Sequence, residues 1–128
     1  MVSSIMSPGI PLTNFVPKSV KNVVFVSDAK QVDDSKKNAK FIGASFCPWS
    51  QLGAAQFAAA CDDLKEEKCY LFDADNPNSK DAAQKLGVMP EGFPHHVIVA
   101  GKGKKAESGG MMKANELRDM MRSNGFKI

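Results

Sequence analysis

A single cysteine, Cys47, stands where the sequence changes from a strand pattern to a helix pattern. Residues 41–47 form a short, mostly apolar run, and Pro48 follows directly. Proline suits the first turn of a helix, because its missing N–H would have no partner there. A helix N-terminus carries partial positive charge and free N–H groups, and both stabilise a thiolate, the reactive form of cysteine. This position therefore indicates a reactive thiol at Cys47.

Two neighbours of Cys47 could take part in its chemistry. Ser50 lies one helical turn later and could donate a hydrogen bond to the thiolate, although it could equally be a helix-surface serine. Trp49 should lie exposed beside the thiol, where it either contacts a partner protein or packs against a nearby segment of the chain. The alternative for Cys47 itself is a vestige of a redox site, in a fold kept for its shape.

The elements that would position these residues alternate in type. The expected strands cover residues 23–27, 41–47, 69–74, 95–100 and 105–108, and the expected helices cover residues 28–37, 49–67, 77–86 and 113–123. Strands separated by helices pair in parallel, whereas the last two, joined by a tight turn, form an antiparallel hairpin. The predicted fold class is α/β, with a mixed central sheet of about five strands and helices on both faces.

The first 21 residues differ in character from the rest. Prolines at positions 8, 11 and 17 oppose helix and regular strand, while the apolar residues between them oppose simple solvated disorder. The sequence predicts an extended N-terminal arm over residues 1–21 and one domain over residues 22–128. We expect this arm to dock onto a protein partner and to contribute nothing to the domain's own core.

Composition excludes several classes. The 128-residue chain has a net charge of +3 and no apolar run long enough for a membrane helix. Its one basic cluster, Lys102, Lys104 and Lys105, is typical of a solvated hairpin tip, so no nucleic-acid or membrane partner is expected. Three cysteines without a close pair do not resemble a disulfide framework. We therefore expect a reducing, intracellular (cytoplasmic) compartment, and membership of a large assembly stays open.

Four features together resemble the thioredoxin family over residues 20–125. They are Cys47-Pro48-Trp49-Ser50 at a strand-to-helix junction, Asp73-Ala74-Asp75-Asn76-Pro77 after a strand, Gly92-Phe93-Pro94 leading into a strand, and Gly109-Gly110 before the last helix. The last feature is shared with glutaredoxins. The resemblance implies a thioredoxin-like fold and a cis peptide bond before Pro94, next to Cys47. It also implies that Trp49, Phe93, Pro94 and His95 bind the substrate.

The chain departs from the thioredoxin pattern at positions that matter for function. The family's second cysteine is Ser50 here, so no neighbouring thiol can resolve a mixed disulfide. Phe41 stands where thioredoxins bury an acidic residue, so no carboxylate is available there for proton transfer. Cys61 lies too far along the expected helix to act with Cys47, and Cys69 is expected to be a small buried hydrophobe. The resemblance is thus to a single-cysteine, Cys-Pro-Trp-Ser variant.

Two histidines follow Pro94, and strand alternation sends them to opposite faces. One of His95 and His96 could lie near Cys47 and favour its thiolate, or both could be structural. Too few ligands accompany them for a metal site. Pro48-Trp49 replaces the Gly-Phe of iron–sulfur glutaredoxins, which disfavours a cluster. No cofactor or metal is expected, although glutathione could serve as an external reductant.

Two functional hypotheses follow. In the first, the chain is a monothiol thiol–disulfide oxidoreductase in which Cys47 and Ser50 are catalytic and the groove at Pro94 holds an extended peptide. In the second, it is a non-catalytic thioredoxin-fold subunit that docks into a larger assembly through residues 1–21. The missing second cysteine favours the adaptor, whereas the retained Cys47, Pro48 and Pro94 favour redox chemistry.

Overall fold

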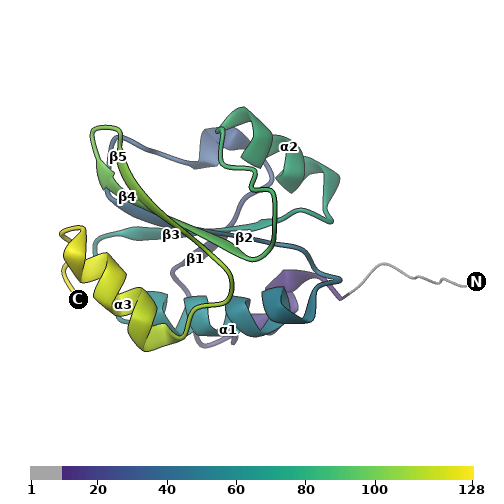
Figure 1. Ribbon diagram of the computed structural model, residues 1–128, viewed down its shortest axis with the longest axis horizontal. Coiled ribbons are helices and arrows are strands. Elements are labelled where there is room, and N and C mark those ends of the chain that lie inside the picture. Colours follow the sequence, from purple (N-terminus) through teal and green to yellow (C-terminus); the bar gives the residue numbers. More distant parts are fainter. Residues whose placement is uncertain (1–9) are drawn as a thin grey trace, which may run out of the picture.

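The computed structural model of the protein describes residues 10–128, which form a five-stranded sheet with helices on both faces (Figure 1). The strands are β1 (Val23–Phe25), β2 (Asn38–Gly43), β3 (Lys68–Asp73), β4 (His95–Gly101) and β5 (Lys104–Gly109). Their order in the sheet is β1-β3-β2-β4-β5. β1, β3 and β2 run parallel, while β4 is antiparallel to both β2 and β5. The expected mixed α/β sheet is confirmed.

Three α-helices cover the sheet, and two of them share one face. They are α1 (Pro48–Asp62), α2 (Pro77–Lys85) and α3 (Ala114–Ser123). In Figure 1, α1 and α3 lie below the sheet and α2 lies above it. Successive side chains of a strand point to opposite faces of the sheet, so the core has two parts. Phe41 packs in the cluster between the sheet and α1, while Ile42 packs in the cluster between the sheet and α2.

The expected helix over residues 28–37 is wrong. Only a 3-10 turn forms there, η2 (Ala29–Gln31), with Asp28 accepting a hydrogen bond from the Lys30 N–H as its cap. The following residues bond locally instead, since the backbone N–H of Ser35 donates to the Asp33 carboxylate at 3.0 Å. Such side-chain-to-backbone bonds compete with helix formation.

The described part of the N-terminal arm belongs to the core, which corrects the expectation that the arm adds nothing to it. A 3-10 turn, η1 (Leu12–Phe15), packs beside α1, and the Leu12 side chain is fully buried. Gly43 makes room for it, because a Cβ at Gly43 would lie 2.9 Å from Leu12 Cδ1. Residues 1–9 lie outside the described residues, so the expected partner contact of the arm stays a prediction.

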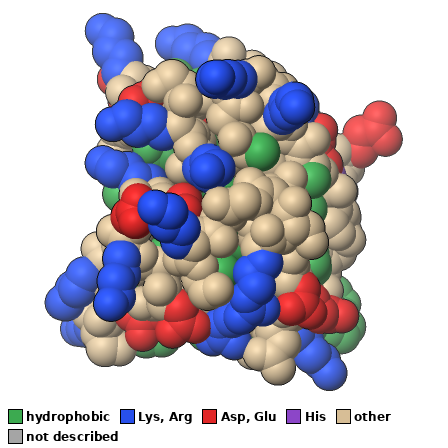
Figure 2. Space-filling model, turned by 90° about the vertical axis from the view of Figure 1, so that its left-hand side faces the viewer, with side chains coloured by type: hydrophobic (Ala, Val, Ile, Leu, Met, Phe, Trp, Pro, Cys, Tyr) green, Lys and Arg blue, Asp and Glu red, His purple; other side chains and the backbone are tan. Residues whose placement is uncertain are grey.

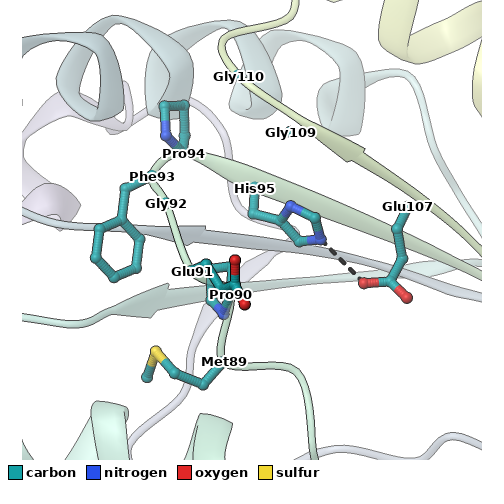
Figure 3. A pocket seen from close by; sticks show the side chains of 10 residues that line it. All are labelled: Met89, Pro90, Glu91, Gly92, Phe93, Pro94, His95, Glu107, Gly109 and Gly110. Carbon is teal, nitrogen blue, oxygen red and sulfur yellow. Dashed lines mark hydrogen bonds and ion pairs between the residues drawn. The ribbon is translucent and has the colours of Figure 1, made fainter.

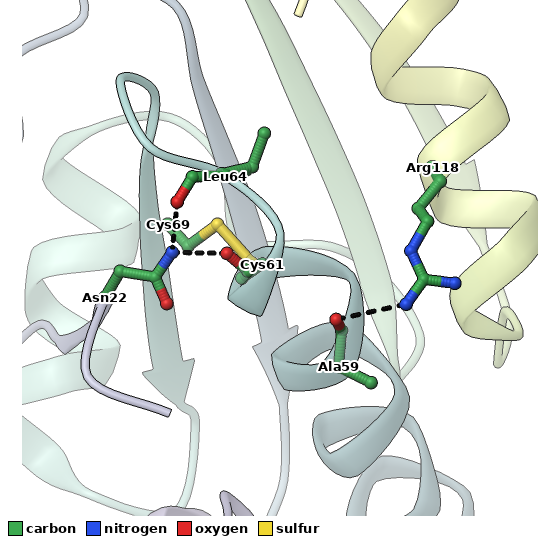
Figure 4. Close-up of a disulfide and its surroundings, with 6 residues drawn as sticks. All are labelled: Asn22, Ala59, Cys61, Leu64, Cys69 and Arg118. Carbon is green, nitrogen blue, oxygen red and sulfur yellow. Dashed lines mark hydrogen bonds between the residues drawn. A yellow bond between two sulfur atoms is a disulfide. The ribbon is translucent and has the colours of Figure 1, made fainter. Parts of the chain in front are cut away.

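Cys61 and Cys69 form a disulfide, which corrects the expectation of unpaired cysteines (Figure 4). Both are fully buried, as expected for Cys69, and their Cα atoms lie 6.3 Å apart. Helix α1 ends at Asp62 and not near residue 67, so a short return brings β3 back beside its last turn. The side-chain amide of Asn22 also stabilises the connection between α1 and β3, because it donates hydrogen bonds to the carbonyls of Cys61 and Leu64.

Figure 2 shows the molecule from the left-hand side of Figure 1, the side that carries the C-terminus and the turn between β4 and β5. Lysine and arginine side chains are spread over this face, with acidic side chains between them. Lys36 and Lys37 line a hollow with Glu66 and Lys127, and Lys127 Nζ lies 3.4 Å from a carboxylate oxygen of Glu66. Among residues 10–128, no helix has both the length and the apolar character needed to cross a membrane.

Candidate active site

Cys47 occupies the position just before the first turn of α1, where the strand-to-helix junction was expected. Its backbone is extended (φ −96°, ψ 116°), and Pro48 begins the helix. The Cys47 N–H donates to the carbonyl of Ala44 at 2.9 Å, and its own carbonyl accepts from Gln51 N–H at 3.1 Å. These two bonds fix the backbone on both sides of the sulfur. The side chain is half-buried and the thiol is free.

Opposing effects act on the thiol pKa of Cys47, and the net direction is downward. Burial raises the pKa, while a hydrogen bond from the Ser50 hydroxyl and bonds from the backbone N–H groups of Ser50 and Trp49 lower it. Hydrogen bonds to a charged group favour that form. The expectation of a lowered thiol pKa at this helix N-terminus agrees with this direction.

Ser50 is fully buried, so it is no helix-surface serine. Its hydroxyl oxygen accepts the backbone N–H of Ala44 at 3.1 Å, which holds the oxygen in place beneath the loop. The hydroxyl proton is then available to the Cys47 sulfur. The sequence alone left this role open, because it could not tell which side of α1 faces the sheet.

Trp49 lies exposed beside the thiol, and two further apolar side chains join it. Phe46, Trp49 and Leu52 are 66%, 61% and 55% exposed, respectively, and we refer to these three residues as the apolar rim. The three residues follow one another at three-residue spacing, at the start of α1 and just before it. The sequence pointed only to Trp49, because Phe46 was expected in a strand over residues 41–47, whereas β2 ends at Gly43.

Pro94 is buried against α1, and the Phe93-Pro94 peptide bond is cis, as the resemblance implied. Gly53 lies in a tight spot beneath it, because a Cβ there would lie 3.1 Å from Phe41 Cε2 and 3.4 Å from Pro94 Cγ. The carbonyl of Pro94 accepts the Gly110 N–H at 2.9 Å. A hollow of about 370 Å³ lies here, lined by Trp49, Phe93, Pro94, Gly110 and Met111. We name it the thiol-side hollow for Trp49, which stands two residues after Cys47, although Cys47 itself does not line it.

The two histidines after Pro94 do face opposite sides, but neither is among the groups that lower the Cys47 pKa. His95 is partly exposed, and its Nε2 lies 3.0 Å from Glu107 Oε1. His96 is fully buried, and its ring packs edge-on against Phe41. The groups that act on the sulfur therefore come from the first turn of α1.

Asp73, at the end of β3, supports the loop that precedes Cys47, and the sequence analysis missed this role. One carboxylate oxygen accepts the N–H groups of Ser45 (3.2 Å) and Asp75 (3.0 Å), and the other accepts the Leu12 N–H at 3.2 Å. The residue is only 4% exposed. An acidic residue at the carboxyl end of a central strand, directly before a turn, was the available signal.

Within residues 10–128, no three His, Cys, Asp or Glu side chains lie together in a way that could hold a metal ion. Two of the three cysteines are joined to each other, so Cys47 is the cysteine left free to act. The arrangement can therefore perform nucleophilic chemistry at one thiol.

No protein-family model matches the chain, and no curated protein is similar to it in sequence. Solved structures are similar in fold. A mutant thioredoxin from Halobacterium salinarum has a TM-score of 0.66 at 18% identity, over 84% of this chain and 94% of that one. Thioredoxin O2 from Arabidopsis thaliana has a TM-score of 0.65 at 19% identity, covering 83% and 96%. Mitochondrial thioredoxin 3 from Saccharomyces cerevisiae has a TM-score of 0.63 at 14% identity, covering 83% and 99%. The chain therefore has the thioredoxin fold.

Proposed function

We propose that the protein performs thiol–disulfide exchange through the single thiol of Cys47. The observation that carries this proposal is the environment of that sulfur, a half-buried thiol at a helix N-terminus. Burial raises its pKa, but the Ser50 hydroxyl and two backbone N–H groups more than offset that effect, so the pKa is lowered. A lower pKa gives more thiolate near neutral pH, and the thiolate is the nucleophile.

The exchange would run in two balanced steps. The Cys47 thiolate attacks one sulfur of a disulfide or a glutathionylated thiol, forms a mixed disulfide with it, and expels the other sulfur as a thiolate. An external thiol such as glutathione then attacks the mixed disulfide, and Cys47 leaves as a thiolate. The external thiol is required because Ser50 stands where a resolving cysteine would have to stand.

The groove beside the sulfur supports a polypeptide substrate. Trp49, Phe93 and Pro94 line the thiol-side hollow, and the apolar rim adjoins it through Trp49. Aromatic and apolar side chains of this kind anchor protein partners. In this proposal Cys47 and Ser50 are the catalytic residues, and the walls of the hollow hold the segment that carries the partner's cysteine.

An adaptor function is the second candidate, and the exposure of the apolar rim favours it. Three large side chains more than half exposed cost free energy in water, and a stable protein partner would cover them. In this version the partner binds through Phe46, Trp49 and Leu52, with residues 1–9 as a further contact, and the thiol has no role.

One experiment separates the two candidates. The full chain is incubated with glutathione disulfide, and its mass is measured before and after addition of glutathione. Thiol–disulfide exchange predicts a single glutathione adduct that disappears with glutathione and does not form in Cys47→Ser. A wild-type chain that forms no adduct at pH 8 would remove the proposed function and leave the adaptor.

A further inference from the structure

A second hollow lies next to the thiol-side hollow. It measures about 500 Å³ and is formed by the loop before β4 together with the end of β5 (Figure 3). We refer to it as the acidic hollow, for the carboxylates of Glu91 and Glu107 in its lining. Nothing in the thiol chemistry described above uses it.

The two hollows share part of their lining. Both are lined by Phe93, Pro94 and Gly110. An extended polypeptide advances about 3.3 Å per residue. A segment bound across Pro94, with its cysteine at the thiol, would therefore carry a nearby side chain toward the acidic hollow.

The charge of the acidic hollow is negative. Glu91 is exposed and makes no ion pair within residues 10–128. The pKa of Glu107 is lowered, chiefly because of its hydrogen bond with His95, which favours the ionised carboxylate. Figure 3 shows the His95 ring directed toward the Glu107 carboxylate. No lysine or arginine of the described chain lines the hollow; Lys105 reaches Glu107 at 3.6 Å without lining it.

Part of the remaining wall is apolar, while His95 and three glycines make up the rest with Pro94. Met89, Pro90 and Phe93 line the hollow beside its two carboxylates. Lysine and arginine side chains bury an aliphatic stem along apolar surface and keep the charged head at a polar end. The hollow thus offers apolar contacts for the aliphatic stem of a basic side chain and carboxylates for its charged head.

We infer that the acidic hollow accepts a lysine or arginine side chain of the polypeptide whose cysteine reacts with Cys47. Glu91 and Glu107 are then specificity-determining residues, and His95 is a positioning residue that orients the Glu107 carboxylate. This inference rests on the proposed function for its substrate. The recognition itself is a binding property and can be measured without the thiol.

The test uses matched nine-residue peptides with one cysteine, activated as mixed disulfides with thionitrobenzoate. Each peptide carries either lysine or glutamate at one position, three residues before or three residues after the cysteine. The peptides are otherwise identical. Cys47 thiolate attacks the peptide sulfur and releases coloured thionitrobenzoate, so the rate is read directly. The lysine peptide should react faster by about fivefold in low salt, since partly exposed ion pairs contribute up to roughly 1 kcal/mol. The preference should shrink as salt rises.

Matched variants assign the effect. In Glu91→Gln/Glu107→Gln the lysine-to-glutamate rate ratio should fall close to one, whereas Asp81→Asn, which removes an acidic group on α2, should keep the wild-type ratio. A lysine-to-glutamate rate ratio of one in the wild type would overturn the inference, and so would a double variant that keeps the wild-type ratio.

A thiol-independent measurement keeps the two proposals apart. Peptides with serine in place of cysteine are labelled with a fluorophore, and their binding to Cys47→Ser is followed by anisotropy. A lysine preference that depends on Glu91 and Glu107 supports the acidic hollow even if Cys47 proves unreactive. Rapid exchange with glutathione disulfide, combined with no lysine preference in either assay, supports the proposed function and defeats the hollow as a subsite.

Discussion

The ring of His96 packs edge-on against Phe41, with ring centroids 5.2 Å apart and planes at 69°, inside the core under α1. Neither ring nitrogen of His96 has a hydrogen-bond partner of good geometry within residues 10–128. Burial lowers its pKa to about 4, against a smaller opposing effect of the Ser108 backbone, so the imidazole is neutral in the folded protein near pH 7. The family resemblance implied a buried acidic residue at the position of Phe41. The neighbour of Phe41 is instead His96, a buried base that stays uncharged.

Acid should destabilise the fold through His96. Its folded pKa lies below the ordinary value of 6.5, so the unfolded chain binds the proton more tightly and stability is lost as pH falls from about 6.5 to about 4. The loss should approach about 3 kcal/mol. The free energy of unfolding in urea, measured at pH 7, 5.5 and 4.5, should fall less steeply in His96→Leu. Ser123→Ala, at the far end of α3, is the control, and parallel curves for wild type and His96→Leu would contradict the expectation.

The reactivity of Cys47 should depend on the Ser50 hydroxyl. In Ser50→Ala the sulfur loses a hydrogen bond that lowers its pKa, so the midpoint of the alkylation rate against pH should move upward. In the wild type this midpoint should lie below the ~8.5 of a free cysteine. Ser123→Ala, at the far end of α3, should leave it in place. A wild-type midpoint at or above ~8.5 would remove the reactive-thiol interpretation.

Restoring a second thiol should increase turnover. Ser50 lies one turn after Cys47, so in Ser50→Cys the new thiol could attack the mixed disulfide internally, without waiting for an external thiol. The wild type should reduce insulin poorly, and the variant should do so faster with dithiothreitol as electron donor. A variant that forms the disulfide between positions 47 and 50 without gaining turnover would show that the groove is not built for catalysis.

Leu12 should contribute to stability as a core residue. Leu12→Ala should cost about 2–5 kcal/mol, because it removes a fully buried side chain that packs with Gly43 and the α1 core. Ile10→Ala is the matched control, since that side chain is 56% exposed. Deleting residues 2–20 should therefore lower the thermal midpoint. An unchanged midpoint would mean that the described part of the arm is dispensable.

The Cys61–Cys69 disulfide should stabilise the corner between α1 and β3. The cysteines are eight residues apart, and a loop of that length predicts about 2.5 kcal/mol from chain entropy. Cys61→Ala/Cys69→Ala should therefore unfold at lower urea concentration than the wild type, and reductant should affect only the wild type. Alkylation of the folded, unreduced chain should label one cysteine, against three after reduction in denaturant. Three labels without reductant would refute the pairing.

Local rules were sufficient where neighbouring residues decide the structure. The start of α1 at Pro48 and the loop that contains Pro94 were predicted, because proline constrains its own backbone and that of the residue before it. The cis form of the Phe93-Pro94 bond followed only from the family resemblance. The missed features depend on where distant segments meet. The pairing of Cys61 with Cys69 required the last residue of α1 to be known. Nothing in the local pattern of Lys40 indicates that it is 1% exposed and paired with Asp34.

The disulfide far from the active site has a practical consequence for whoever handles the protein. With Cys61 and Cys69 joined in the core, the folded chain presents one addressable sulfur without any engineering. A maleimide dye or spin label would attach at Cys47 alone, next to Trp49, which is the chain's single tryptophan. The emission of an environment-sensitive dye at that position would then change when a partner enters the groove at Pro94.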